Sequence, residues 1–177
     1  KDFSQINYIG LEHELMQNYY ETVMDVVSGY GRAGIDMMAI VKARVELDNI
    51  AMICRLKKYF RAAPDQIRPM ITHTTYLFND REMEDLISSS TADQVIEKMQ
   101  KKYHRYVKNV KFSSIEHYTG MIRYHMNYHF LKNSTEPKLV LLSYLLLSRI
   151  EIQNVVNIIE GVSYGIGADH MKPMLVY

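Results

Sequence analysis

The sequence has a single cysteine and no tryptophan, and its charges nearly cancel. The lone Cys54 cannot form a disulfide within the chain, which favours a reducing compartment over a secreted protein. A formal net charge of +1 is not typical of a protein whose main partners are polyanions. Because 47% of the residues are hydrophobic, the composition also differs from that of a disordered chain. These features predict a soluble globular protein.

Long hydrophobic runs are missing as well. The longest, Leu139 to Leu147, is interrupted by a serine and a tyrosine and is then closed by Arg149 and Glu151. It is shorter than the ~20 apolar residues that span a bilayer. No signal peptide is visible, and the chain opens with Lys1 rather than Met, so we expect it to begin inside a longer polypeptide.

Catalytic motifs are scarce. There is no nucleophile elbow, P-loop, cysteine pair or carboxylate dyad. Gly29, Gly31 and Gly34 do spell Gly-x-Gly-x-x-Gly, the dinucleotide fingerprint, but that motif requires a strand before it and an acidic residue about twenty positions later. A helical pattern precedes these glycines, so we interpret them as a turn between helices.

Three histidines suggest one further alternative. His125 and His129 are four residues apart on a predicted helix, and His117 lies two turns earlier. A zinc site needs three or four ligands, and no Glu follows the first histidine as in His-Glu-x-x-His. Packed or exposed histidines on a tyrosine-rich helix explain the pattern, and we expect no metal and no cofactor.

Apolar residues recur every three or four positions along most of the chain, which predicts an all-α fold without a significant β-sheet. A threonine-rich linker is expected at 72–78. Capping boxes are expected at Asn79 with Glu82, Thr91 with Gln94, and Ser113 with Glu116. The long helices are expected at 9–27, 35–60, 113–131 and 138–160.

The chain also contains an internal repeat. Residues 44–59 align with 149–164, so that Arg, Glu, Asn, Ile and Tyr recur at matching positions. The match continues from 68–71 to 172–175 after a one-residue gap, and upstream from Leu11-Glu-His to Ile115-Glu-His. We therefore expect pseudo-repeated helical domains: 1–71 would be a partial unit whose start is missing, and 72–177 a complete unit.

Polar residues interrupt the apolar face of the repeated helix. Asn49 lies in the middle of an apolar stripe and Glu46 lies at its flank. With Glu151 and Asn154 of the second copy, they could form a buried structural network of hydrogen bonds. Alternatively, a carboxylate could be placed there for proton transfer, although no base, nucleophile or metal ligand stands beside it. Asn127, by contrast, is expected at the surface.

The repeated residues resemble a known family. An Arg-x-Glu-x-x-Asn-x-x-x-Ile helix, present from Arg44 and again from Arg149, and preceded by a helix with a Tyr-Tyr pair at 19–20, is similar to the C subunit of archaeal and bacterial V-type (A-type) ATPases, called the d subunit in eukaryotic V-ATPases. The resemblance implies three similar all-helical domains arranged as a funnel. The copies depart from each other where Leu56 of the first stands opposite Gly161 of the second.

The same resemblance implies a function. The protein would be a non-catalytic subunit, cytoplasmic and peripheral to the membrane, that seats the central stalk (the D and F subunits) on the membrane rotor ring for H+ or Na+ transport. The structural polar motif would comprise Arg44, Glu46, Asn49, Arg149, Glu151 and Asn154. Neither a small-molecule substrate nor nucleic acid would be a partner.

A different class of protein remains as the alternative. An unrelated all-helical repeat scaffold could bind a protein or nucleic acid through the basic segment 98–111. Basic residues interleaved with aromatics can follow a phosphate backbone, although a solvated charged face is the more usual explanation. The segment contains Lys98, Lys101, Lys102, Tyr103, His104, Arg105, Tyr106, Lys108 and Lys111.

Overall fold

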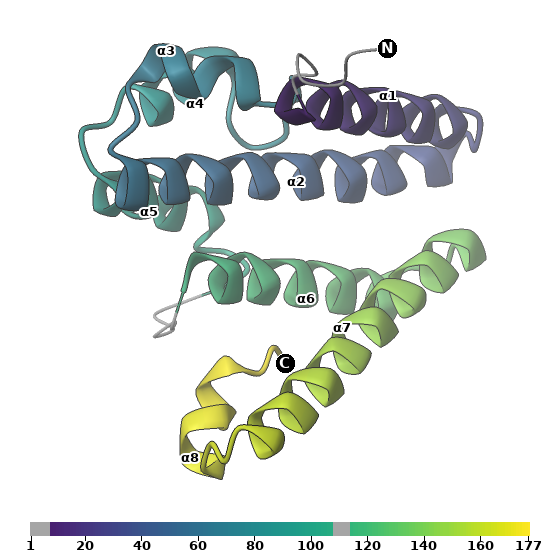
Figure 1. Ribbon diagram of the computed structural model, residues 1–177. Coiled ribbons are helices and arrows are strands. Elements are labelled where there is room, and N and C mark those ends of the chain that lie inside the picture. The colour runs from purple at the N-terminus through teal and green to yellow at the C-terminus, as the bar shows by residue number, and fades with distance from the viewer. Residues whose placement is uncertain (1–7, 108–113) are drawn as a thin grey trace, which may run out of the picture. The chain divides into compact units, whose positions relative to one another are not determined.

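The computed structural model describes residues 8–107 and 114–177, and all regular secondary structure in these ranges is helical (Figure 1). The all-α prediction is confirmed. The chain divides into two compact units, Lys1–Val95 and Ile96–Tyr177. This division does not test the repeat units 1–71 and 72–177, which remain a prediction.

The first unit begins with a hairpin of two long helices, α1 (Tyr8–Ser28) and α2 (Arg32–Arg55), which pack along each other (Figure 1). Gly31 starts α2 at φ 60°, a backbone conformation that glycine adopts without strain. A Cβ atom on Gly34 would lie 2.5 Å from the carbonyl oxygen of Val27, so glycine allows the two helices to approach closely at the turn. The Gly-x-Gly-x-x-Gly pattern therefore joins two helices and follows no strand.

Helix α2 is covered over most of its circumference. It continues as one turn of π-helix, η2 (Leu56–Phe60), and stops at Arg61, whose φ of 50° is left-handed. Its buried residues include polar Glu46 and Asn49. The apolar members of the buried set are Ala33, Met37, Ile40, Ala43, Val45, Leu47, Ile50, Ala51, Ile53 and Cys54.

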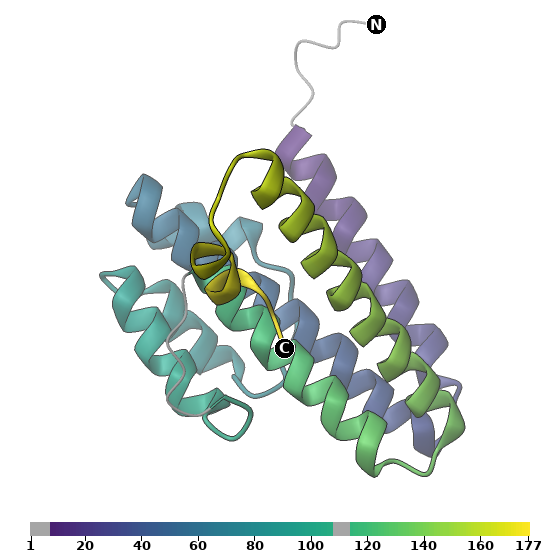
Figure 2. The ribbon, with the colours of Figure 1, turned by 90° about the horizontal axis from the view of Figure 1, so that it is seen from below.

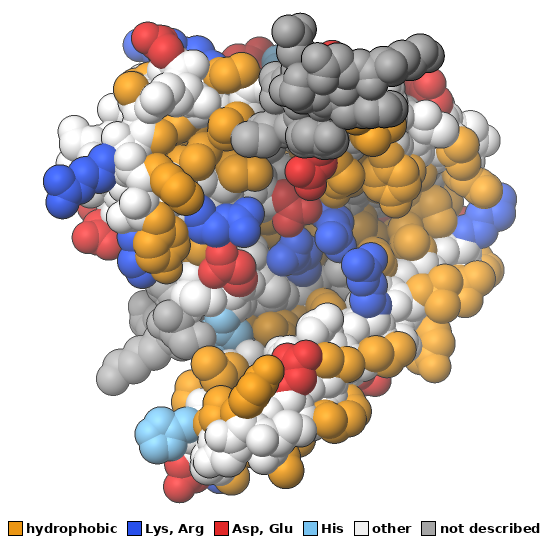
Figure 3. Space-filling model, viewed as in Figure 1, with side chains coloured by type: hydrophobic (Ala, Val, Ile, Leu, Met, Phe, Trp, Pro, Cys, Tyr) orange, Lys and Arg blue, Asp and Glu red, His pale blue; other side chains and the backbone are white. Residues whose placement is uncertain are grey.

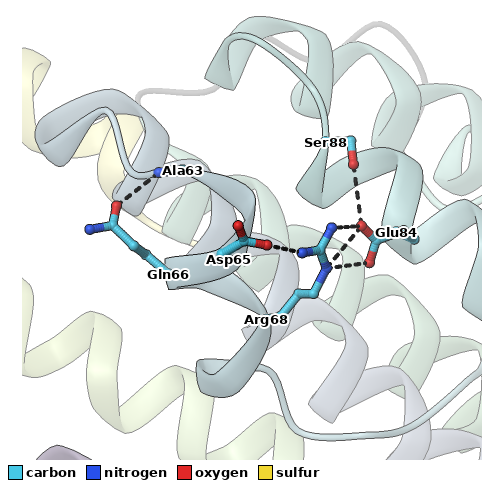
Figure 4. Close-up of polar contacts among 6 residues, drawn as sticks. All are labelled: Ala63, Asp65, Gln66, Arg68, Glu84 and Ser88. Carbon is cyan, nitrogen blue, oxygen red and sulfur yellow. Dashed lines mark hydrogen bonds and ion pairs between the residues drawn. The ribbon is translucent and has the colours of Figure 1, made fainter.

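Short elements complete the first unit. After α3 (Pro64–Ile67) and the 3₁₀ helix η3 (Arg68–Met70), the chain runs without regular structure to α4 (Asp80–Ile87). The Arg68 guanidinium donates hydrogen bonds to the carboxylates of Asp65 and Glu84, which ties η3 to α4 (Figure 4). This pairing lowers the pKa of Glu84 below its ordinary value. In the same view, Gln66 accepts a hydrogen bond from the Ala63 N–H at 2.9 Å.

Three helix starts can be compared with their predicted caps. The box at Asn79 is confirmed: its side chain accepts the Glu82 N–H at 2.9 Å, and Glu82 accepts the Asn79 N–H at 3.0 Å. At α5 (Ala92–Tyr103), which crosses the boundary between the units, half of the predicted box is present, because Thr91 Oγ1 accepts the Gln94 N–H at 3.4 Å. Gln94, however, reaches back to the N–H of Ser90 rather than to that of Thr91.

The third predicted cap, Ser113, lies outside the described residues. The structure caps α6 (Ile115–Asn133) with Ser114, whose Oγ accepts the His117 N–H at 3.1 Å. The observed cap is therefore one residue later in the chain than the predicted one.

The second unit also contains a hairpin of long helices, α6 and α7 (Pro137–Ser163) (Figures 1 and 2). It is followed by α8 (Ala168–Met171) and the 3₁₀ helix η4 (Lys172–Met174). The order of two long helices, a short helix and a 3₁₀ helix is the same as in α1, α2, α3 and η3. The aligned Arg68-Pro-Met and Lys172-Pro-Met triplets form the two 3₁₀ helices.

Helix α7 is apolar and largely exposed. Within the described ranges it is the one helix long and apolar enough, by length and composition alone, to cross a membrane, because it extends well beyond the apolar run 139–147. Hydrophobic side chains lie along it in the lower right of Figure 3.

Candidate functional site

Glu46 holds the irregular segment before α4 against α2. Its carboxylate accepts hydrogen bonds from three successive backbone N–H groups, those of Tyr76 at 2.8 Å, Leu77 at 3.2 Å and Phe78 at 3.0 Å. Glu46 is fully buried, so these donors replace water around the charge. The stretch predicted to be a linker is thus anchored at a fixed position.

Asn49, one helical turn further along α2, holds the beginning of the same segment. Its Nδ2 donates to the carbonyl oxygen of Thr72 at 2.7 Å, and its Oδ1 accepts the Thr72 N–H at 3.1 Å. Both residues are buried. One amide side chain therefore satisfies both backbone polar groups of one buried residue, which would otherwise be costly to remove from water.

Asn154 makes the same pair of hydrogen bonds in the second unit. Its Nδ2 donates to the carbonyl oxygen of Val176 at 2.7 Å, and its Oδ1 accepts the Val176 N–H at 3.0 Å. The bonded residues are 23 positions apart for Asn49 and 22 for Asn154, which matches the one-residue gap in the sequence alignment. Gly120 of α6 faces this anchored segment, because a Cβ there would lie 3.0 Å from Val176 Cγ2.

The remaining motif residues are in different environments. Arg44 contacts Asp48 at 3.5 Å, and the Tyr20 hydroxyl donates to Asp48 at 3.4 Å, which links α1 to α2. Burial and then the Asp48 carboxylate raise the pKa of Tyr20. Arg149 and Glu151 are exposed on α7. Glu151 therefore differs from its counterpart Glu46, although the two occupy the same place in the repeat.

The three histidines do not come together. His117 Nε2 contacts the carbonyl oxygen of Leu175 at 3.1 Å, whereas His129 Nδ1 contacts Asn133 at 3.1 Å. Burial lowers the pKa of His125. No group of three or more metal-ligating side chains occurs in the part of the chain that the structure describes.

The basic segment is described only as far as Val107, so Lys108 and Lys111 lie outside the described residues. Its Tyr103 is fully buried and forms part of the core. Arg105 lies over its neighbour Tyr106, 4.7 Å from the ring centroid, and Lys101 pairs with Glu97 at 2.7 Å. Tyr103, one of the two aromatic residues of this segment, is therefore engaged within the protein.

Taken together, polar side chains of α2 and α7 bind backbone groups and hold irregular segments in place. Sequence reasoning located Glu46 and Asn49 but missed the groups they bind, because backbone N–H and carbonyl groups have no sequence signature. The contact between His117 and Leu175 was missed for the same reason. The repeated Arg-Pro-Met and Lys-Pro-Met triplets were the available signal, since each stands just before an anchored residue.

This arrangement defines an all-helical structural protein in which side chains of long helices hold irregular segments in place. The sequence profile of the family described as ATP synthase (C/AC39) subunit matches residues 2–174, and the chain belongs to this family of V/A-type ATP synthase subunits. Comparisons with curated proteins and with solved structures returned no match. The family is a non-catalytic, peripheral subunit of the membrane-bound ATPase, so the protein is not itself an enzyme.

Proposed function

We propose that this protein is the socket of a rotary V-type or A-type ATPase, seating the foot of the central stalk, formed by the D and F subunits, on the membrane rotor ring. Torque from ATP hydrolysis would then pass to H+ or Na+ transport, or in the reverse direction. Membership of the C/AC39 family supports a place in this complex.

The observation that carries the proposal is the anchoring of irregular segments by buried side chains. A protein that transmits torque has to resist deformation, and well-packed helices have low compressibility. Loops are ordinarily the most mobile parts of a fold. Here Glu46 fixes 76–78, and Asn49 and Asn154 fix Thr72 and Val176. The hydrogen bonds thus stiffen the connections that would otherwise bend under load.

The proposal also specifies location and partners. The protein would lie on the cytoplasmic face of the membrane as part of the complex and contact the stalk and the rotor ring. The two halves with the same element order would be copies of one helical unit, the first within 1–71 and the second within 72–177. Neither nucleic acid nor a small-molecule substrate would bind.

Reconstitution tests the proposal. A complex assembled without this protein should still hydrolyse ATP in its soluble part but should move few or no ions across the vesicle membrane. Adding the purified protein back should restore ion transport. Full ATP-driven ion transport by the complex lacking the protein would contradict the proposal.

A further inference from the structure

Corresponding faces of α2 and α7 differ sharply in exposure. In α2, Glu46 is 0% exposed, whereas Glu151 is exposed. The apolar neighbours of these carboxylates are likewise buried in α2 and exposed in α7. The exposed fractions are 0% for Leu47 and 65% for Ile152, 0% for Ile50 and 55% for Val155, and 3% for Cys54 and 60% for Ile159. The face is thus present in both helices but covered in only one.

The covered face shows what such a surface accommodates. Residues 76–78 present three successive N–H groups to the Glu46 carboxylate and then lead, through the Asn79 cap, into α4. Helix α4 packs against α2 and buries Met83, Leu86 and Ile87. On α2, therefore, backbone N–H groups bind the Glu46 carboxylate, and the amphipathic helix that follows them packs on the same helix.

On α7 the asparagine–backbone pair that lies beside the glutamate in α2 is also present. Asn154 holds Val176 by the same two hydrogen bonds that Asn49 makes to Thr72, so the helix presents Glu151 beside an anchored irregular segment, as α2 presents Glu46. What α7 lacks, among the described residues, is a segment that donates to Glu151.

We propose that the face of α7 formed by Glu151, Ile152, Val155 and Ile159 is a docking surface for a polypeptide segment built like residues 76–87. The segment would bend where it meets Glu151, as residues 76–78 do, would donate successive backbone N–H groups to the carboxylate, and would continue as a capped amphipathic helix over the three apolar side chains.

Charge distinguishes this occupant from a lipid bilayer. A carboxylate at the edge of the apolar face requires hydrogen-bond donors, which a bent backbone segment supplies and lipid hydrocarbon does not. Arg149, also exposed on α7, adds a second charge to the apolar helix. A polypeptide that combines backbone donors with an apolar helix satisfies both parts of the surface.

The probe for this surface is a fluorescein-labelled peptide of residues 74–90, which contains the three donors, the Asn79 cap and all of α4. Fluorescence anisotropy on titration with the protein should show saturable binding. The Glu151→Ala variant should bind at least about tenfold more weakly, because it loses charge-assisted hydrogen bonds. The matched Glu160→Ala variant removes another exposed carboxylate of α7 and should bind as the wild type does.

A peptide N-methylated at Leu77 and Phe78 keeps its side chains but loses two of the three donors, and it should bind as weakly as the native peptide binds to Glu151→Ala. Equal binding of both peptides would overturn the proposal, as would the absence of saturable binding. Cosedimentation with uncharged lipid vesicles, or a dimer whose formation requires Ile152, would also overturn it, because another occupant would then cover the face.

Discussion

Asn49 and Thr72 are joined by two hydrogen bonds, of 2.7 and 3.1 Å, through which one side chain satisfies both backbone polar groups of the other residue. The pair closes a connection of 23 positions within the first unit. The same arrangement recurs between Asn154 and Val176. These pairs are local elements of stiffness, and their contribution to stability can be measured.

Replacing Asn49 with leucine should lower the free energy of unfolding by about 1–3 kcal/mol, because the N–H and carbonyl groups of Thr72 would be left buried without partners. Urea denaturation of the purified protein measures this change. Asn18 is exposed on α1, and Asn18→Leu should change stability by no more than about 0.5 kcal/mol. Equal midpoints for the two variants would show that the Asn49 hydrogen bonds contribute nothing measurable.

Glu46→Ala and Glu151→Ala form a matched pair at equivalent places in the repeat. Glu46→Ala removes the acceptor of three backbone N–H groups and should lower the free energy of unfolding by about 3 kcal/mol or more. Glu151→Ala removes an exposed side chain, and its free energy of unfolding should stay within about 0.5 kcal/mol of that of the wild type. Thermal unfolding followed by circular dichroism compares them. Similar losses in both variants would be inconsistent with the difference in burial.

Gly34→Ala tests the close contact between α1 and α2. The new Cβ would meet the carbonyl oxygen of Val27, so backbone must shift, at a cost of about 1–3 kcal/mol. A Cβ on Gly29 would lie 3.4 Å from its nearest neighbour, an ordinary contact, and Gly29→Ala should be tolerated. If Gly34→Ala were as stable as Gly29→Ala in urea, the helices would not require glycine at this turn.

The Arg68–Glu84 pair should make stability depend on pH in the acid range. Because hydrogen bonding to Arg68 lowers the pKa of Glu84 from its ordinary value of 4.5, the pair stabilises the folded protein above about pH 4.5. That contribution is lost as pH falls through the lowered pKa. The stability difference between the wild type and Arg68→Met should therefore be present at pH 7 and shrink below about pH 4.5.

The two side chains are about half exposed, so the difference at pH 7 should be small and should decrease further in about 1 M salt, where charges are screened over about 3 Å. Urea titrations at several pH values, with and without salt, provide the measurement. A difference that stays constant from neutral to acid pH would exclude the ion pair as its cause.

Much of the fold could be predicted from the sequence because its signals are local. The apolar period marks the long helices, and the Asn79 capping box marks the start of α4. Environments set by tertiary contacts could not be predicted in this way. Asn127, expected at the surface, is buried, and its Nδ2 donates to the Arg123 carbonyl oxygen at 2.7 Å. The expectation was wrong because helical periodicity does not specify every packed neighbour.

In the candidate site, too, the sequence indicated which residues are polar and buried but not what they contact. The position of Asn49 within an apolar stripe indicated a buried polar group, and its partner proved to be backbone of the threonine-rich stretch. Glu46 and Glu151 occupy identical motif positions, so the sequence predicts one environment for both. Their burial differs because it depends on the segments that pack against each helix.

Isothermal titration calorimetry of the protein with the purified heterodimer of the D and F stalk subunits tests the proposed socket most directly. We predict saturable binding of the heterodimer and no heat of binding with ATP or ADP under the same conditions. Asn18→Leu should bind like the wild type. Tight nucleotide binding without binding of the stalk heterodimer would contradict the assignment as a coupling protein of the rotary ATPase.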